Sequence, residues 1–223
     1  DGDPFYEGGS TKGVDVTASS SNIQKNMQKH FPSSTWVLQG WGNNPTKQLL
    51  DGLNKLNVLI IELFGENTNN WEKRQGYENT PFIWSNVSNF GEKNGLYGRL
   101  ERFNEEVFRA KKSVYGPLLR GVGIIPEGIN NNPVTYDFML ELGWHENKVD
   151  VSKWIENYTQ YRYGVANDTI IKAWQLLLET VYSSPNVYQE GPSESIFCAR
   201  PDTNVKAVST WGTRKRNYNI EKF

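Results

Sequence analysis

The sequence predicts an α/β protein made of parallel strand–helix units, followed by an all-helical stretch. Two observations predict this fold class. Four short apolar runs alternate with longer segments of helical periodicity, and the alternation stops after Trp144, where only helical patterns follow. Strands that alternate with helices at this rhythm form parallel βα units, whose helices cover the sheet.

The candidate strands are nearly continuous apolar runs rather than alternating ones. This is the pattern of parallel strands that are covered on both faces. The third run is short enough to be a piece of buried helix instead. The four runs are 35–39, 58–63, 82–84 and 122–125.

Between these runs, apolar residues recur at helical spacing. Proline suits the first turn of two of these helices, after Asn44 and after Asn132. The apolar stripes are Ile23, Met27 and Phe31; Leu49, Leu50, Leu53 and Leu56; Leu100, Phe103, Val107 and Phe108; and Val134, Phe138 and Leu142. About four βα units fit before residue 145, whereas a closed eight-stranded barrel takes about 250 residues. The segment is therefore either a small open sheet or half of a barrel.

A change in pattern near residue 145 predicts two domains, 1–145 and 146–223. Residues 151–163 and 169–182 have helical periodicity, with no strand signal between them. From Ser183 onward, Pro, Ser, Asn and Gly dominate, which predicts a loop or a helical domain that is cut short. The chain opens on Asp1 without a signal peptide, and we expect it to be the middle of a longer protein.

Composition excludes several classes of protein. The net charge is −1 and no basic stripe is present, so we expect no nucleic-acid partner. One cysteine and two separated histidines, His30 and His145, predict no metal site. No run approaches eighteen apolar residues, so we expect no membrane span.

The residues that follow the predicted strands are rich in acids, amides and indoles. In a barrel, the carboxyl ends of the strands face the active site. Glycosidic cleavage needs this inventory, because two carboxyl groups about 5 Å apart can split an acetal without a metal or cofactor. The strand-end segments are Gln39-Gly40-Trp41, Glu62-Leu63-Phe64, Trp84-Ser85-Asn86 and Pro126-Glu127-Gly128, with Pro4 to Gly9 resembling the tail of one more strand.

Among these acids, Glu127 is the better catalytic candidate. Pro126 and Gly128 bracket it in a turn directly after an apolar strand, so its side chain is held in one direction. Glu62 is the main rival, since it also closes an apolar strand. Sequence spacing does not say which two carboxylates meet.

Seven motifs, in order, closely resemble the α-N-acetylglucosaminidases of glycoside hydrolase family 89. The resemblance extends from Asp1 to about Tyr182. The motifs are Asp3-Pro4-Phe5-x-Glu7, Leu38-Gln39-Gly40-Trp41, Pro81-Phe82-Ile83-Trp84, Asn89-Phe90-Gly91 with Gly95-Leu96-x-Gly98, Pro126-Glu127-Gly128-Ile129, Glu141-Leu142-Gly143-Trp144 and Arg162-Tyr163-Gly164-Val165.

This resemblance implies the C-terminal half of a catalytic (β/α)8 barrel over 1–145 and the beginning of a C-terminal α-helical domain over 146–223. Family members are retaining exo-hydrolases that need no metal or cofactor. By motif, Glu7 falls on the acid/base and Glu127 on the nucleophile. Trp41, Trp84 and Asn89 fall on residues of the sugar pocket. Tyr6 stands at a possible sugar contact where the family usually has Asn or His, and we expect it to bind substrate. Ser88 stands where the family often has His. Because of these two departures, fine specificity stays open.

We therefore expect a retaining glycosidase that releases terminal α-linked N-acetylglucosamine from glycans such as heparan sulfate or mucin-type chains. Two alternatives remain: a carbohydrate-binding protein or inactive fragment on the same fold, and a retaining glycosidase for another sugar. The expected partner is a glycan, and the missing N-terminal half of the barrel is needed for a complete site. Family members work in lysosomes or outside the bacterial cytoplasm, so we expect a secreted, periplasmic or lysosomal protein.

Overall fold

The computed structural model describes residues 4–6, 10–88, 96–129, 132–184, 203 and 218–223. Two of the expected site residues, Glu7 and Asn89, lie outside this described part. The chain forms two compact units. Unit 1 contains Asp1–Asn86 and Arg109–Gly123, and unit 2 contains Val87–Phe108 and Ile124–Phe223.

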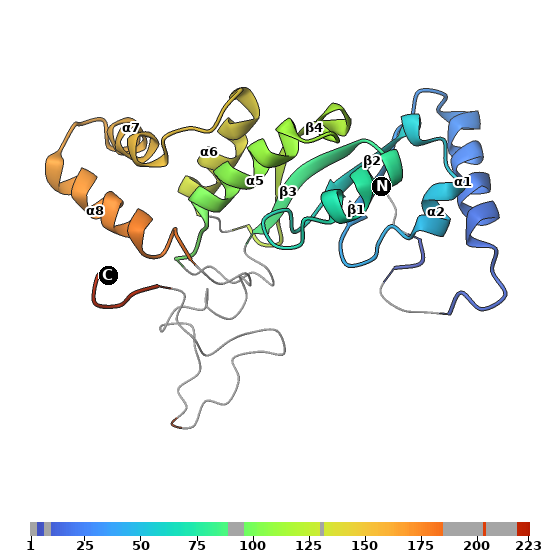
Figure 1. The fold of residues 1–223 in the computed structure, drawn as a ribbon, viewed down its shortest axis with the longest axis horizontal. Helices are drawn as coiled ribbons and strands as arrows, with labels where there is room; N and C mark the ends of the chain where they lie inside the picture. Colours follow the sequence, from blue (N-terminus) through green and yellow to red (C-terminus); the bar gives the residue numbers. More distant parts are fainter. Residues whose placement is uncertain (1–3, 7–9, 89–95, 130–131, 185–202, 204–217) are drawn as a thin grey trace. The chain divides into compact units, whose positions relative to one another are not determined.

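A four-stranded parallel sheet in the order β1-β2-β3-β4 organises the chain (Figure 1). Trp36 pairs with Val58, and Ile60 with Phe82, so the first three strands run in register. The strands are β1 (Trp36–Gly40), β2 (Val58–Glu62), β3 (Phe82–Ser88) and β4 (Leu119–Pro126). All four predicted strands are confirmed, and the fold is that of a (β/α)8-barrel segment followed by a helical domain.

Helices follow the strands along the chain. The longer ones are α1 (Val16–His30), α5 (Leu100–Lys112), α6 (Pro133–Glu141), α7 (Val151–Tyr163) and α8 (Asp168–Glu179). Short turns are α2 (Lys47–Asp51), α3 (Asn70–Lys73), α4 (Gln75–Asn79) and the 3-10 helices η1 (Lys55–Asn57), η3 (Gly116–Leu118) and η4 (Leu142–Trp144). Among the described residues, no helix has the length and apolar character needed to cross a membrane.

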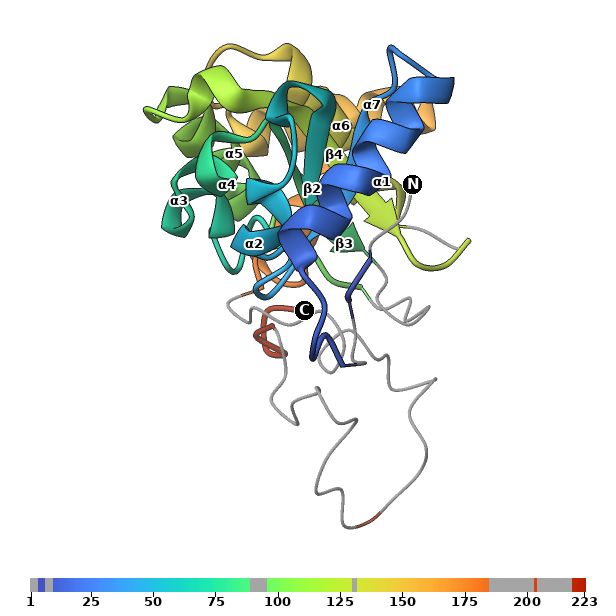
Figure 2. The same ribbon diagram turned by 90° about the vertical axis from the view of Figure 1, so that its right-hand side faces the viewer.

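In unit 1, α1 lies beside α2, as both views show (Figures 1 and 2), but not through the predicted stripe. Ile23 and Phe31 are exposed, whereas Ser20 and Gln24 are buried. Ser20 Oγ donates to the Leu49 carbonyl at 2.9 Å, and Gln24 exchanges two hydrogen bonds with the backbone of Asn54. The predicted face of α1 was wrong because polar side chains that bind backbone groups occupy the buried face.

The predicted helix through Leu49 and Leu56 is also shorter than expected. Helix α2 ends at Asp51, and Leu56 lies in η1 with 87% of its surface exposed. A Cβ at Gly52 would lie 2.2 Å from the Thr17 carbonyl oxygen. The close approach of α1 therefore requires glycine at the end of α2, and the helix stops there.

A left-handed turn precedes β3 and was not predicted. All five residues of α4, Gln75 to Asn79, have positive φ angles between 50° and 63°. Such a backbone is costly for residues with a Cβ, and it persists only when the surroundings hold it. Arg74 and Glu78 form two hydrogen-bonded contacts across the turn, and Lys55 Nζ donates to the Glu78 carbonyl at 2.6 Å. The turn points Tyr77 into the core, where its side chain is fully buried.

In unit 2, α7 and α8 form a helical hairpin (Figure 1). Ser152 and Gln175 are joined by two hydrogen bonds, and the ring of Tyr158 meets Trp174 edge-on. Helix α8 ends at Glu179, before the predicted end at residue 182, because the backbone leaves the helical region at Thr180. Tyr182 then returns to Leu100 through a backbone hydrogen bond and is buried.

Candidate active site

A barrel places its catalytic residues at the carboxyl ends of its parallel strands. The ends of β1 and β2 lie in unit 1, whereas the ends of β3 and β4 lie in unit 2.

At the end of β1, the structure brings Tyr6 and Trp41 together. Tyr6 Oη donates to the Gln39 carbonyl oxygen at 2.9 Å. The two rings meet edge-on, with centroids 6.2 Å apart and an angle of 82°. Both side chains are half-buried, so each keeps part of an aromatic face accessible. Their contact with a sugar stays a prediction.

Trp84, where the predicted run ended, lies inside β3, which continues to Ser88, and its side chain is completely buried in the described part of the chain. Its indole lies under Gly65, where an added Cβ would approach a ring carbon to 2.5 Å. The Gly65 backbone nitrogen donates to the Ser85 carbonyl at 3.0 Å, so the loop after β2 closes over this indole. A role for Trp84 in sugar binding stays a prediction.

The rival acid, Glu62, ends β2 and is also fully buried. Its Oε1 atom accepts a 2.8 Å hydrogen bond from the backbone nitrogen of Asn70. Burial raises the pKa of Glu62 to about 8, and the charge of Glu66 raises it further. Hydrogen bonds from the Asn70 and Trp71 backbone and the charge of Lys73 lower this pKa, but by less than burial raises it. Glu62 is therefore a neutral acid at pH 7 and is unsuited to act as an ionised nucleophile.

Sequence reasoning did not connect Glu62 with the residues that surround it, and it missed Glu66 and Tyr77. Glu66 is 1% exposed and accepts a 2.5 Å hydrogen bond from the Asn86 side-chain amide. Tyr77 is buried beneath Gly40, where an added Cβ would lie 2.8 Å from its hydroxyl oxygen. The spacing Glu62-x-x-x-Glu66 directly after a strand was the available signal, but the link to Asn86 joins different strands and is invisible in sequence.

In unit 2, Glu127 directly follows β4 and its side chain is exposed. Its backbone nitrogen donates to the Ser88 carbonyl oxygen at 3.3 Å, which joins it to the last residue of β3. Burial raises the pKa of the nearby Tyr136, and a hydrogen bond between its side chain and that of Ser88 lowers this pKa by less. Glu127 is thus an exposed carboxyl group directly after a strand, and its role as the nucleophile stays a prediction.

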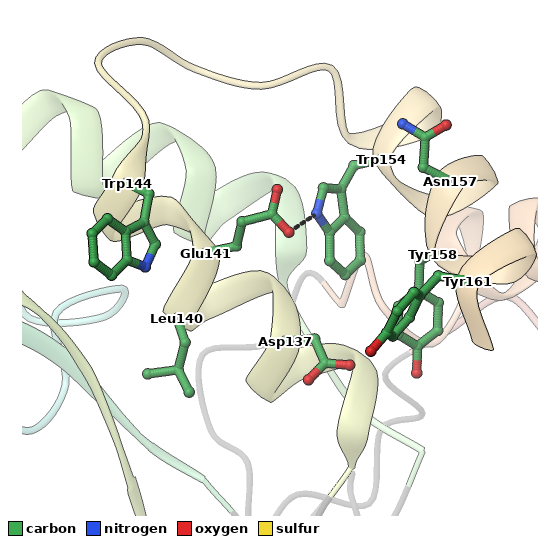
Figure 3. A pocket seen from close by; sticks show the side chains of 8 residues that line it. All are labelled: Asp137, Leu140, Glu141, Trp144, Trp154, Asn157, Tyr158 and Tyr161. Carbon is green, nitrogen blue, oxygen red and sulfur yellow. Dashed lines mark hydrogen bonds between the residues drawn. The ribbon is translucent and has the colours of Figure 1, made fainter.

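A separate pocket of about 530 Å³ lies in unit 2 between α6, η4 and α7 (Figure 3). Trp154 Nε1 donates to Glu141 Oε2 at 2.7 Å, and Trp144 lies on the other side of this carboxylate. None of the predicted site residues lines it. Its lining consists of Asp137, Leu140, Glu141, Trp144, Trp154, Asn157, Tyr158 and Tyr161.

Within the described ranges, no group of three or more histidine, cysteine or acidic residues could hold a metal ion. The chemistry available at the strand ends is that of carboxyl groups, amides and aromatic rings.

Comparison with known proteins agrees with this fold. Residues 1–146 match the family model for the "Alpha-N-acetylglucosaminidase (NAGLU) tim-barrel domain", and residues 154–223 match the model for the C-terminal domain of the same proteins. The fold and the strand-end carboxyl groups define a segment of a glycoside-hydrolase barrel.

More particularly, the chain belongs to the α-N-acetylglucosaminidase family. It is 30% identical over 209 residues to human alpha-N-acetylglucosaminidase, covering 89% of this chain and 28% of the human protein. A family 89 glycoside hydrolase from Clostridium perfringens, in complex with 2-acetamido-1,2-dideoxynojirmycin, superimposes with a TM-score of 0.88 at 35% identity, covering 99% of this chain and 25% of that one.

A variant of the same bacterial enzyme, with two glutamates replaced by glutamine, was solved in complex with its substrate GlcNAc-alpha-1,4-galactose. It matches at 34% identity with a TM-score of 0.88, again over 99% of this chain and 25% of the other. The chain therefore spans about a quarter of the length of these relatives.

Proposed function

We propose that this chain contributes both catalytic carboxyl groups of a retaining exo-glycosidase that releases terminal, non-reducing α-linked N-acetylglucosamine. The observation that carries the proposal is Glu127, an exposed carboxyl group at the end of β4 in a chain of the α-N-acetylglucosaminidase family. The substrate complex of the bacterial relative supports it, because two glutamates are replaced there. Those two glutamates lie about as far apart in sequence as Glu7 and Glu127 do here.

In the first step, the ionised Glu127 attacks the anomeric carbon while Glu7 donates its proton to the leaving glycosidic oxygen. The carbon–oxygen bond to the leaving group breaks, and an ester bond forms between the sugar and Glu127. In the second step, Glu7 takes a proton from water, the water oxygen attacks the same carbon, and the ester bond breaks. Glu127 is ionised and Glu7 is protonated again, and the sugar keeps its α configuration.

Aromatic faces and amides hold the sugar in this proposal. Trp41, with Tyr6 edge-on to it, offers a ring face at the end of β1. Trp84 and Asn89 complete the pocket, as their motif positions imply. The natural substrates we propose are glycans such as heparan sulfate or mucin-type chains, and the relative's substrate, GlcNAc-alpha-1,4-galactose, supports a terminal α-linked N-acetylglucosamine.

We further propose that hydrolysis needs the rest of the barrel. Among the described strands, β1 and β4 are the two edges of the sheet, and unpaired edges favour aggregation or pairing with further strands. The 223 residues alone should therefore be inactive. Secretion to the periplasm or exterior in a bacterium, or to the lysosome in an animal, fits the expected glycan substrates.

The test uses the complete enzyme and an aryl α-N-acetylglucosaminide. Glu127→Gln and Glu7→Gln should each lower kcat by at least about 1,000-fold, while the control Glu105→Gln, an exposed acid on α5, keeps the wild-type rate. Proton NMR of the first-formed sugar should show the α anomer. Wild-type rates in either glutamine variant, or a β product, would contradict the mechanism. Binding without turnover by the wild type would instead favour the sugar-binding alternative.

A panel of aryl glycosides decides the other alternative. Faster hydrolysis of an aryl glycoside without the 2-acetamido group would assign the site to another sugar.

A further inference from the structure

The mechanism above leaves unexplained a set of buried polar groups beneath the ends of three neighbouring strands in unit 1. Tyr77 lies under Gly40 at the end of β1, Glu62 ends β2, and Asn86 lies near the end of β3. The side chains of Tyr77 and Glu62 are 0% exposed and that of Asn86 is 1% exposed. Burying a polar group destabilises the folded protein unless the group is hydrogen-bonded. The alignment of these buried groups along the strand ends therefore requires an explanation.

Among the described residues, no ion pair to Glu62 is formed. Its carboxyl group accepts hydrogen bonds from the backbone of Asn70 and Trp71 on one side, and within the same described part Oε2 has no hydrogen-bond partner. The titratable groups that face it are Glu66 on the following loop, Lys73 on α3 and Tyr77 on α4. Since a buried carboxyl group without an ion pair retains its proton, Glu62 is a neutral acid in the folded protein.

Glu66 and Asn86 join the loop after β2 to the end of β3. Asn86 Nδ2 lies 2.5 Å from Glu66 Oε1, and Ser85 Oγ donates to the Glu62 carbonyl oxygen. With the bond from Gly65 to Ser85, two contacts fasten this loop over Trp84, while the bond from Ser85 to Glu62 joins β3 to the end of β2. A second negative charge at Glu62 would lie beside Glu66 within this fully buried junction and would force the loop away from the strand to reach water.

The left-handed turn α4 brings the Tyr77 hydroxyl group near Glu62. The charge of Glu62 is the largest effect after burial on the pKa of Tyr77, and both raise it, so the two groups are electrostatic neighbours. Arg74 lies over the Tyr77 ring at 5.0 Å and is ion-paired with Glu78 across the turn. The left-handed turn thus places a buried hydroxyl group near Glu62.

We propose that Glu62 is a positioning residue of the sugar site: as a neutral acid, it lets the loop after β2 close on β3 and so fixes Trp84 and Asn86 at the catalytic edge. This inference rests on the proposed glycosidase function. It assigns Glu62 a role distinct from that of Glu7 and Glu127, because Glu62 acts through the strand ends and not on the reacting bond. Its removal or ionisation should therefore change KM more than kcat.

The experiment measures kcat and KM of the complete enzyme from pH 5 to pH 9 on an aryl α-N-acetylglucosaminide. It compares wild type, Glu62→Gln, Glu62→Leu and the control Asp51→Asn, which alters an exposed pair with Lys47. Circular dichroism at each pH confirms that the protein is folded. The wild-type KM should rise at least threefold between pH 7 and pH 9. Glu62→Gln, which is neutral and similar in shape, should keep a KM within threefold of the pH 6 wild-type value throughout the range.

Glu62→Leu, which cannot accept the Asn70 hydrogen bond, should raise KM at least tenfold at pH 6 with kcat within threefold. A Glu62→Gln profile that superimposes on the wild-type profile would overturn the proposal, as would a Glu62→Leu enzyme with wild-type KM. The pH dependence of the unfolding free energy, wild type against Glu62→Gln, reads the protonation of Glu62 without any substrate. If the wild type hydrolyses no glycoside, the proposed function fails together with this role, while the unfolding measurement still shows whether Glu62 is neutral.

Discussion

Asn86 donates a 2.5 Å hydrogen bond to Glu66 although both side chains are 1% exposed. The two residues belong to different segments, the end of β3 and the loop after β2, and their contact is the side-chain link between those segments. Because the carboxylate is surrounded by protein, its affinity for the amide hydrogen is not weakened by water.

Replacing Asn86 with aspartate would therefore put a second carboxyl group against Glu66. We expect Asn86→Asp to lower the free energy of unfolding by about 3 kcal/mol at pH 7, the range for leaving a buried charge uncompensated. The loss should shrink at pH 5, where one of the two carboxyl groups can take a proton. Denaturant unfolding at both pH values measures this, with Asn57→Asp on the exposed turn η1 as the control. A loss equal at the two pH values would show that charge repulsion is not the cause.

The second prediction concerns the pH dependence that Glu62 gives to stability. Its pKa is about 8 in the folded protein, against 4.5 when it is exposed in the unfolded chain. Below pH 4.5 both states carry the proton. Between pH 4.5 and pH 8 only the folded state retains it, so the contribution of this group to stability falls by about 1.4 kcal/mol per pH unit.

The variant Glu62→Gln has no proton to lose. The free energy of unfolding of Glu62→Gln, minus that of the wild type, should therefore increase as pH rises from 5 to 8, because only the wild type loses stability. The difference should level off above pH 8. Guanidinium unfolding at half-unit pH steps measures the slope, and subtracting the two curves removes the contributions of all other groups. A difference that stays constant with pH would mean that Glu62 is ionised in the folded protein.

The sheet could be predicted from the sequence because its strands are short, nearly continuous apolar runs rich in branched side chains. Runs such as Val58-Leu59-Ile60-Ile61 have few polar interruptions, and no other local structure of that length buries so many branched side chains. The candidate nucleophile was equally accessible to sequence reasoning, since Glu127 directly follows such a run. The bracketing Pro126 and Gly128, and then the family motif, favoured it over Glu62, and its role stays a prediction.

The rest could not be predicted, for reasons visible at particular residues. The buried face of α1 contains Ser20 and Gln24, which bind backbone groups of another segment, whereas a periodicity argument counts apolar residues only. The left-handed turn from Gln75 to Asn79 contains a single glycine, so its composition gave no signal. The hydrogen bond between Glu66 and Asn86 forms because the loop after β2 meets the end of β3. The local sequence of either segment does not indicate which other segment it will contact.

The third prediction uses the tight fit of Gly65 over Trp84. An added methyl group at residue 65 would lie 2.5 Å from the indole, so Gly65→Ala must displace either the loop or the ring. We expect a loss of about 2 kcal/mol in unfolding free energy, typical of overpacking. The control is Gly123→Ala, where the added Cβ would meet Ile83 at an ordinary 3.4 Å. If Trp84 helps to hold the sugar, KM of the complete enzyme should rise in Gly65→Ala and not in Gly123→Ala; equal effects in the two variants would argue against a specific fit.

The fourth prediction separates the two tryptophans of the unit 2 pocket. Trp154 donates to Glu141 at 2.7 Å, meets Phe138 edge-on at 4.8 Å and stacks on Tyr158 at 5.2 Å, so it ties α6 to α7. Trp144 lines the same pocket but is 88% exposed. Trp154→Ala should lower the unfolding free energy by about 3 kcal/mol, and Trp154→Phe, which keeps a ring but loses the indole hydrogen bond, by about 1 kcal/mol.

Trp144→Ala should change the unfolding free energy by less than about 0.5 kcal/mol, as is usual for an exposed side chain. Thermal and denaturant unfolding of the three variants measures this order. In the complete enzyme, a loss for Trp144→Ala as large as that for Trp154→Ala would contradict the prediction, because it would mean that protein buries the exposed indole. Loss of stability only in the Trp154 variants would show that the hydrogen bond to Glu141 and the ring contacts, and not the pocket surface as such, hold α6 and α7 together.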